Sequence, residues 1–205
     1  MRVVVFISGR GSNLQALLEH QKNYTVCHVI SNRARANGLS IAKSYAVPST
    51  VIPWRDTAQA EAKALALLKV LNPDLIVLAG FMRVLSASFV ANFPFKIINI
   101  HPSLLPLYPG LNTHQRALND HQTKHGATVH YVDQHLDRGH SISQSHINIT
   151  AQDTAETLAA RLLSKEHTLL TTTVNKIACG EIYWQDNQLF YNNQLITQPI
   201  VWSNL

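Results

Sequence analysis

The chain has 205 residues, a formal net charge of +5 and two cysteines. Hydrophobic residues make up 46% of it and charged residues 14%, a balance typical of a folded domain and not of a disordered chain. Lysines and arginines are scattered, with no cluster beyond Arg33 and Arg35, so we expect no nucleic-acid partner. Cys27 and Cys179 lack metal-binding spacing, and no stretch approaches membrane-spanning length. These features predict a cytoplasmic protein with no membrane contact and no metal.

The first half alternates buried strands with helices. Apolar runs predict strands over residues 3–7, 25–30, 49–53, 74–79 and 96–100. Helical patterns predict four helices. One begins at about Ser12, one covers residues 38–46, one ends near Leu71, and a short one begins at Ser86. Ser12 and Gln15 have the spacing of a capping box, which predicts side-chain capping of the first helix. Alternation of this kind is typical of right-handed crossovers and a parallel sheet.

The second half has a different pattern. Residues 127–133 and 142–149 alternate like strands near a sheet edge, and Asp153 and Glu156 are expected to cap a long helix. The tail predicts short antiparallel strands joined at residues 186–187 and 192–193. We therefore predict a single domain of α/β class, with a doubly wound, Rossmann-like, mostly parallel sheet that continues into a small α+β C-terminal part.

A glycine-rich turn, "FISGRGSN", separates the first strand from the first helix. Glycines let a ligand approach the backbone, and the first amides of a helix bind phosphate. The third glycine of a dinucleotide fingerprint is absent, because Leu14 stands in its place, and no P-loop sequence follows. We favour a single phosphate bound by Gly11, Ser12 and Asn13; the alternative is a turn that is merely tight.

A polar cluster follows the fifth strand, in "INIHPSLLPLYPG". Asn99 and His101 are two residues apart on a strand, so their side chains leave the same face at the carboxyl end of the sheet, where ligands of open α/β sheets bind. Asp137 lies in a later loop between two strands. An amide, an imidazole and a carboxylate suit acyl transfer to a nucleophile that belongs to the substrate. Asn99 would hold the oxyanion and His101 would donate a proton.

In this hypothesis Asp137 would fix a water and keep the imidazole protonated. Each residue also has an ordinary alternative, a turn asparagine or a hydrogen-bonded core histidine. The histidines and aspartates between 130 and 140 fit neither a helix face nor a strand face, so no metal site is predicted.

Five segments together resemble the glycinamide ribonucleotide formyltransferases of the folate-dependent formyltransferase family. They are "SGRGSNLQ", "PDLIVLAGFMRVLS", "NIHPSLLPLYPGLNTHQRAL", "HGATVHYV" and "LDRGHSISQ", and they occur in the family's order over about residues 2–170. The resemblance implies transfer of the formyl group of 10-formyltetrahydrofolate, a co-substrate, to the amine of 5-phosphoribosylglycinamide in purine (IMP) biosynthesis. We divide the single domain, residues 1–205, into a Rossmann-like phosphate-binding half (1–100), a catalytic and folate half (101–175) and a short antiparallel tail (176–205).

The resemblance assigns roles to residues of this chain. The catalytic trio falls on Asn99, His101 and Asp137, the phosphate turn on residues 11–13, and the glutamate near the substrate amine on Glu166. The residues that the resemblance places around the folate are Arg55, Met82, Arg83, Val84, Leu85, Asn99, Asp133, Gln134, His135, Leu136 and Asp137.

The sequence departs from the family after the catalytic aspartate, where D-G-G-P is usual. Here Arg138 replaces a flexible glycine and His140 replaces the proline. The alternatives are another formyltransferase, a formyltetrahydrofolate hydrolase, or a catalytically silent folate- or phosphate-binding protein. The expected assembly is a monomer or a homodimer.

Overall fold

The structure is a computed structural model that describes residues 1–202. It divides into two compact units, Met1–Asn99 and Ile100–Leu205, which are described in turn. The last three residues of the predicted tail, 203–205, lie outside the described residues.

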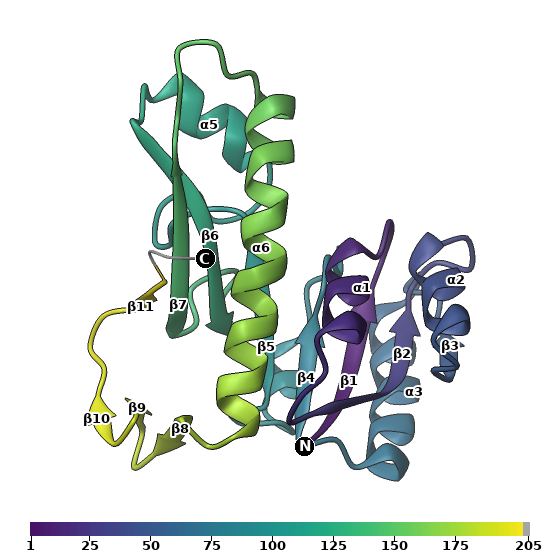
Figure 1. The fold of residues 1–205 in the computed structure, drawn as a ribbon. Coiled ribbons are helices and arrows are strands. Elements are labelled where there is room, and N and C mark those ends of the chain that lie inside the picture. The colour runs from purple at the N-terminus through teal and green to yellow at the C-terminus, as the bar shows by residue number, and fades with distance from the viewer. Residues whose placement is uncertain (203–205) are drawn as a thin grey trace. The chain divides into compact units, whose positions relative to one another are not determined.

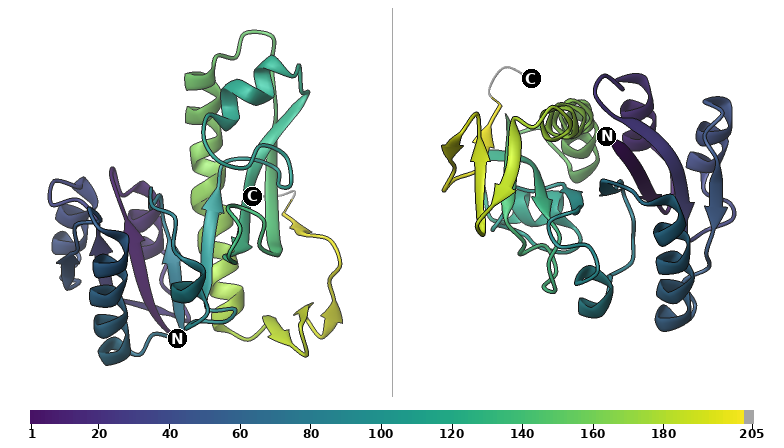
Figure 2. Two further views of the ribbon diagram at one scale, coloured as in Figure 1. Left: turned by 180° about the vertical axis from the view of Figure 1, so that it is seen from behind. Right: turned by 90° about the horizontal axis from the view of Figure 1, so that it is seen from below.

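The first unit is a parallel sheet flanked by helices. Its strands lie in the order β5-β4-β1-β2-β3, and every neighbouring pair runs parallel. They are β1 (Arg2–Ile7), β2 (Thr25–Ser31), β3 (Ser49–Val51), β4 (Leu75–Leu78) and β5 (Ile97–His101), the last of which continues into the second unit. The helices are α1 (Ser12–Glu19), α2 (Asn37–Ser44), α3 (Thr57–Leu71) and α4 (Ala87–Val90). Figure 2 shows α1 and α2 on one face of the sheet and α3 on the other.

Apolar runs become the central strands of this sheet. The side chains from Val3 to Ile7 are fully buried, and all four residues of β4 are buried. A strand covered on both faces cannot alternate in polarity, which explains the continuous hydrophobic sequence. In α3, Ala64 and Leu68 are buried as predicted, whereas Leu67 and Leu71 are only half-buried.

Helix starts agree with prediction better than helix caps do. The first helix begins at Ser12 as predicted, but the predicted capping box is wrong: Gly11 is the N-cap, no side chain caps the helix, and Gln15 bonds to Glu19. Gly11 has a φ of 83°, so the turn enters the helix through a left-handed residue.

The cap of the long helix is also shifted from its predicted residues. Its capping box is formed by Thr154 and Thr157, and Asp153 instead accepts from Thr150 and pairs with Arg161. A threonine hydroxyl at the N-cap position satisfies the first free amide directly, which leaves Asp153 free to hold the preceding turn.

The second unit packs a long helix along a β-hairpin (Figure 1). Strands β6 (Lys124–Tyr131) and β7 (Ser141–Asn148) are antiparallel, and β11 (Ile200–Val201) runs parallel to β7. The helices are α5 (Thr113–Asn119), which was not predicted, and α6 (Ala155–Ala178). A small antiparallel sheet at the carboxyl end of α6 contains β8 (Ile182–Gln185), β9 (Gln188–Tyr191) and β10 (Gln194–Leu195).

The two predicted turns of the tail are confirmed. Asp186 and Asn187 have φ of 50° and 58°, and Asn192 and Asn193 have φ of 49° and 64°. Two consecutive left-handed residues are characteristic of tight two-residue hairpin turns, and Asn and Asp tolerate that conformation best after glycine. The fold is thus α/β with mostly parallel strands and a small antiparallel sheet near the C-terminus, as predicted. Within residues 1–202, no helix has the length and apolar character needed to cross a bilayer.

A buried carboxylate holds the segment that joins β4 to α4. The Glu61 side chain of α3 accepts hydrogen bonds from the Ser86 amide at 2.7 Å and from the Ser86 hydroxyl at 2.5 Å. Ser86 in turn caps α4 by accepting from the Phe89 amide at 3.1 Å. At the other end of the segment, the Met82 amide donates to the Ser8 hydroxyl at 2.8 Å. Residues 82–86 are therefore fixed at both ends within the first unit.

We expect Glu61→Ala to lower the free energy of unfolding by about 1–3 kcal/mol, because it removes the acceptor of two hydrogen bonds at a buried position. Glu61→Gln keeps an acceptor and is expected to lose less. Lys63→Ala, at an exposed position of the same helix, is the control and should change stability by less than about 0.5 kcal/mol. Urea denaturation measures all three. Equal stabilities of Glu61→Ala and Lys63→Ala would contradict the role given to the carboxylate.

Candidate active site

Strand β5 carries the first two candidate residues. Ile97, Ile98 and Ile100 are buried, Asn99 is half-buried and His101 is 5% exposed. A polar side chain at the end of such a strand needs partners, because an unpaired buried polar group is costly. The partners of His101 therefore define the site.

The structure brings His101 and Asp137 together in the second unit. The His101 Nδ1 atom lies 3.3 Å from Asp137 Oδ2, and Nε2 lies 2.9 Å from the Tyr108 carbonyl oxygen. Both ring nitrogens thus face acceptors. A charged imidazolium would satisfy both, whereas a neutral ring donates to only one of them.

Asp137 is held by more than His101. Its Oδ2 atom accepts from the Gly110 amide at 2.8 Å, and its Oδ1 atom lies 3.6 Å from His130 Nε2. The side chain is only 8% exposed, and the residue has a φ of 52°. The predicted trio did not include His130 or Gly110 as partners of this carboxylate. The alternation of β6 does put His130 at a strand end like His101, which was the available signal.

The surroundings shift the pKa of both groups. Burial alone would raise the pKa of Asp137, but hydrogen bonds from His130 and Gly110 and the nearby imidazoles outweigh it, so its pKa lies below the ordinary value. Burial lowers the pKa of His101, and the Tyr108 carbonyl and Asp137 offset this only in part. The expectation that Asp137 keeps the imidazole protonated is therefore wrong for the free protein, because desolvation of the ring is the larger effect.

A second pair of histidines lies next to His101. His125 Nε2 is 3.0 Å from His114 Nδ1, and the two rings meet edge to face. Burial, followed by the neighbouring His114, lowers the pKa of His125 to about 4. The pKa of His114 is also lowered, first by burial and then by His101. At neutral pH this pair is neutral and forms part of the polar core of the second unit.

The other candidate residues of the second unit lie around this core. Glu166 is half-buried in the middle of α6. In the loop before Asp137, the Asp133 carboxylate accepts from the His135 amide at 2.7 Å, and Gln134 is exposed. Leu136 is 54% exposed. The stretch 133–136 therefore presents its side chains outward, unlike Asp137.

The candidates of the first unit lie on two turns and before one helix. Gly11, Ser12 and Asn13 form the start of α1 and are each half-buried. In the segment 82–85, Met82, Arg83 and Val84 are exposed and Leu85 is buried. Arg55 is exposed directly before Asp56, the N-cap of α3.

The two glycines of the turn have different structural duties. A Cβ at Gly11 would lie 2.5 Å from the Gly38 Cα of α2, and the φ of 83° is unfavourable for any other residue. A Cβ at Gly9 would meet nothing within 4 Å. Close contact between α1 and α2 thus explains Gly11, with or without a bound phosphate.

Gly11→Ala is expected to destabilise the protein by about 1–3 kcal/mol, since it combines a strained backbone with a backbone clash. Gly9→Ala is the matched control two residues away and should stay within about 0.5 kcal/mol of the parent. Thermal unfolding of the two variants tests this. A Gly9→Ala loss as large as that of Gly11→Ala would show that the glycines serve something other than helix packing.

The lowered pKa of His125 predicts how the stability of the protein depends on pH. Its pKa is about 4 in the folded protein against 6.5 for an unperturbed histidine, so the unfolded chain binds more protons between these values. Stability should therefore fall as the pH drops from 6.5 to 4, on the order of 2 kcal/mol from this residue, and be unaffected above that range.

Chemical denaturation at a series of pH values measures the slope. His125→Gln removes the titrating group and should flatten it, whereas His121→Gln, at an exposed position, should not. An unchanged slope in His125→Gln would rule out this residue as the source.

Comparisons with known proteins identify the family. Residues 1–174 match the family model described as formyl transferase. The chain is 37% identical over 201 residues to the phosphoribosylglycinamide formyltransferase of Escherichia coli (strain K12), with 95% of each protein covered. The solved phosphoribosylglycinamide formyltransferase of Coxiella burnetii is 40% identical, with a TM-score of 0.93 and 98% of both chains covered.

A formyltetrahydrofolate deformylase from Pseudomonas syringae is a more distant neighbour. It is 26% identical, with a TM-score of 0.86, and the match covers 93% of this chain but 65% of the deformylase. These matches confirm the resemblance drawn from the five sequence segments. All three matched proteins are enzymes. The chain belongs to the formyl transferase family.

Proposed function

We propose that the protein transfers the formyl group of 10-formyltetrahydrofolate to the amine of 5-phosphoribosylglycinamide, a step of purine biosynthesis. The observation that carries the proposal is the end-to-end likeness to phosphoribosylglycinamide formyltransferases, which covers 95% of the Escherichia coli protein and 98% of the Coxiella burnetii chain. The His101–Asp137 pair of the second unit supports it, because acyl transfer to an amine needs a proton acceptor and donor at the reacting carbon.

In the proposed reaction the substrate amine attacks the formyl carbon directly. A C–N bond forms, and the carbonyl oxygen becomes an oxyanion that the Asn99 amide stabilises. Collapse breaks the bond to the folate nitrogen, which takes up a proton, while the new amide nitrogen loses one. His101 is the group proposed to carry a proton between these sites.

The neutral ring of His101 is suited to take up a proton first. Asp137 and the Tyr108 carbonyl both face the ring, and the contact that remains with substrate bound would stabilise the imidazolium once it forms. Since both ring nitrogens are occupied in the free protein, the substrate must displace one of these contacts to reach the ring. Asp137, with its pKa held low, stays ionised and orients the imidazole throughout.

The remaining assignments follow the family resemblance. Gly11, Ser12 and Asn13 would hold the substrate phosphate on the amides of α1, and Glu166 would lie near the amine. Arg55, residues 82–85 and residues 133–137 would contact the folate. The cytoplasmic location, the monomeric or homodimeric state and the lack of a nucleic-acid partner stay predictions.

The principal alternative is hydrolysis of 10-formyltetrahydrofolate, the activity named for the Pseudomonas syringae neighbour. The degree of likeness speaks against it, since the chain is 26% identical to the deformylase but 37% and 40% identical to the two phosphoribosylglycinamide formyltransferases. Assay of tetrahydrofolate release with and without 5-phosphoribosylglycinamide separates the two. Amine-dependent release supports transfer, amine-independent release indicates hydrolysis, and no release indicates a silent binding protein.

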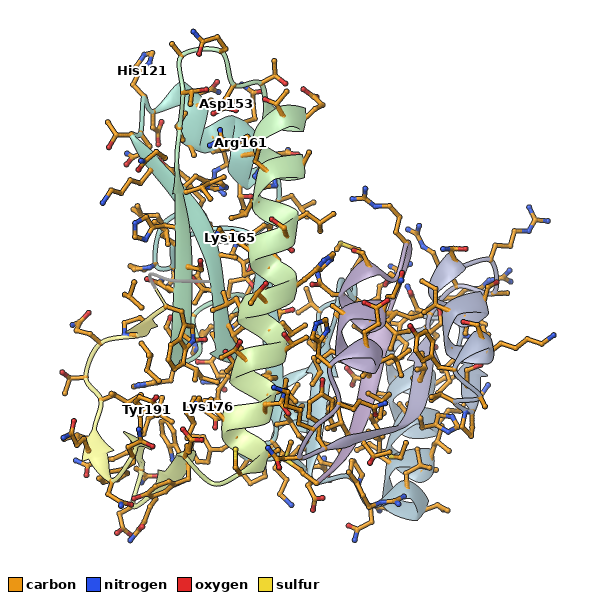
Figure 3. All side chains as sticks on the ribbon, in the orientation of Figure 1. His121, Asp153, Arg161, Lys165, Lys176 and Tyr191 are labelled. Carbon is orange, nitrogen blue, oxygen red and sulfur yellow. The ribbon has the colours of Figure 1, made fainter. Side chains whose placement is uncertain are left out.

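His101→Ala and Asp137→Ala should each lower kcat by roughly 10²-fold or more, the usual effect of removing an acid–base or charge-stabilising group. Asp153→Ala is the control for loss of a buried carboxylate, because the Asp153 side chain is 4% exposed but serves the start of α6 (Figure 3). It should reduce stability and leave kcat nearly unchanged. Near-normal turnover in Asp137→Ala would refute the proposed mechanism.

A further inference from the structure

The loop that carries Asp137 joins β6 to β7, and its two ends lie close together. We call these two ends, Tyr131 and His140, the neck of the loop. Tyr131 ends β6 and His140 directly precedes β7, and the Tyr131 amide donates to the His140 carbonyl at 2.9 Å. Gly139 is pressed against the same point, since a Cβ there would overlap the Tyr131 carbonyl oxygen. The neck therefore sets the direction in which the loop departs.

Between the neck and Asp137 the loop has little packing of its own. The side chains of Asp133 and His135 are 44% and 58% exposed, and Leu136 is also exposed. Asp137 itself is in the left-handed region, which is unfavourable for a residue with a Cβ. Residues 133–136 therefore depend on the ends of the loop and on the contacts of Asp137 for their position.

Trp184 of β8 packs against both sides of the neck. Its ring centroid is 5.6 Å from that of Tyr131, at 74°, and 5.1 Å from that of His140, at 81°. Both contacts have the edge-to-face geometry that aromatic rings favour. One side chain from the C-terminal sheet thus spans the two ends of the loop.

The small sheet that carries Trp184 is itself anchored. Lys176, near the end of α6, bonds to Glu181 at 2.5 Å and lies over the Tyr191 ring at 5.9 Å (Figure 3). Beyond the small sheet, the chain returns to pair β11 with β7. The tail is therefore attached at α6 and at β7, on either side of Trp184 in sequence.

We propose that Trp184 is a positioning residue for formyl transfer. By packing on Tyr131 and His140 it fixes the neck of the loop, and so the approach of Asp137 to His101. The inference rests on the proposed function, in which the His101–Asp137 pair handles the proton. It gives the C-terminal tail a part in the reaction although none of its residues is assigned to substrate.

The test combines turnover with hydrogen exchange of the loop. Trp184→Ala should lower kcat about 10-fold with the KM for 5-phosphoribosylglycinamide changed less than about twofold, because misplacing a catalytic group by about 1 Å costs up to about 10²-fold in rate. Exchange of amides in residues 129–141, including the Tyr131 amide, should accelerate. Trp184→Phe keeps an aromatic ring and should restore most of both properties.

Tyr183→Ala is the matched control on the same strand. Tyr183 alternates with Trp184 and stacks on Phe190, with ring centroids 5.3 Å apart, so its loss weakens the small sheet without touching the neck. It should lower kcat and accelerate loop exchange much less than Trp184→Ala does. His140→Ala removes the ring from the loop side and tests the same contact should Trp184→Ala fail to fold.

The outcomes are distinct. Normal kcat and normal loop exchange in Trp184→Ala and His140→Ala would overturn the proposal, as would an equal loss of kcat in Tyr183→Ala. Absence of formyl transfer in the parent protein would instead refute the proposed function. The exchange measurement then still decides whether Trp184 holds the neck.

Discussion

A buried carboxylate organises the second unit of this protein. The Asp137 side chain is 8% exposed, and taking an isolated charge out of water is strongly unfavourable unless hydrogen bonds replace the lost hydration. The Gly110 amide and the imidazoles of His101 and His130 supply that replacement. Each comes from a different part of the chain, so the burial of the charge is compensated only where all of these parts are folded together.

The same arrangement explains the state of His101. The ring sits at the end of an apolar strand, and desolvation there lowers its pKa although a carboxylate lies beside it. A neutral ring that keeps the Asp137 carboxylate beside it gains a proton at little reorganisation cost, which is a useful property in a group that must take up and return a proton within one turnover.

The sequence allowed the framework to be predicted but not the contacts made by irregular loops. The strands followed from apolar runs such as 3–7, and the place of His101 followed from the rule that ligand sites lie at the carboxyl ends of parallel strands. Asp137 was added to the site by its chemistry and by the family resemblance. The role of Gly110 did not follow, because it depends on a backbone amide in a loop that has no periodicity. Capping was mispredicted for a similar reason: a left-handed Gly11 starts α1 without the side chains that the local pattern favoured.

The altered loop sequence and the C-terminal tail meet in the contact between His140 and Trp184. Where the resembled family usually has proline, this chain has His140, and the fixed φ that a proline supplies is lost. The contact with Trp184 offers a different constraint at the same place, because an aromatic ring clamped between Tyr131 and His140 restricts both ends of the loop through packing. The covalent restriction of φ in a proline and the packed contact of Trp184 can both limit the motion of the loop. The packed contact, however, makes the geometry of Asp137 depend on the folding of the small C-terminal sheet. Substitutions in the loop and in the tail are therefore expected to depend on one another, since residues that share a contact seldom act additively.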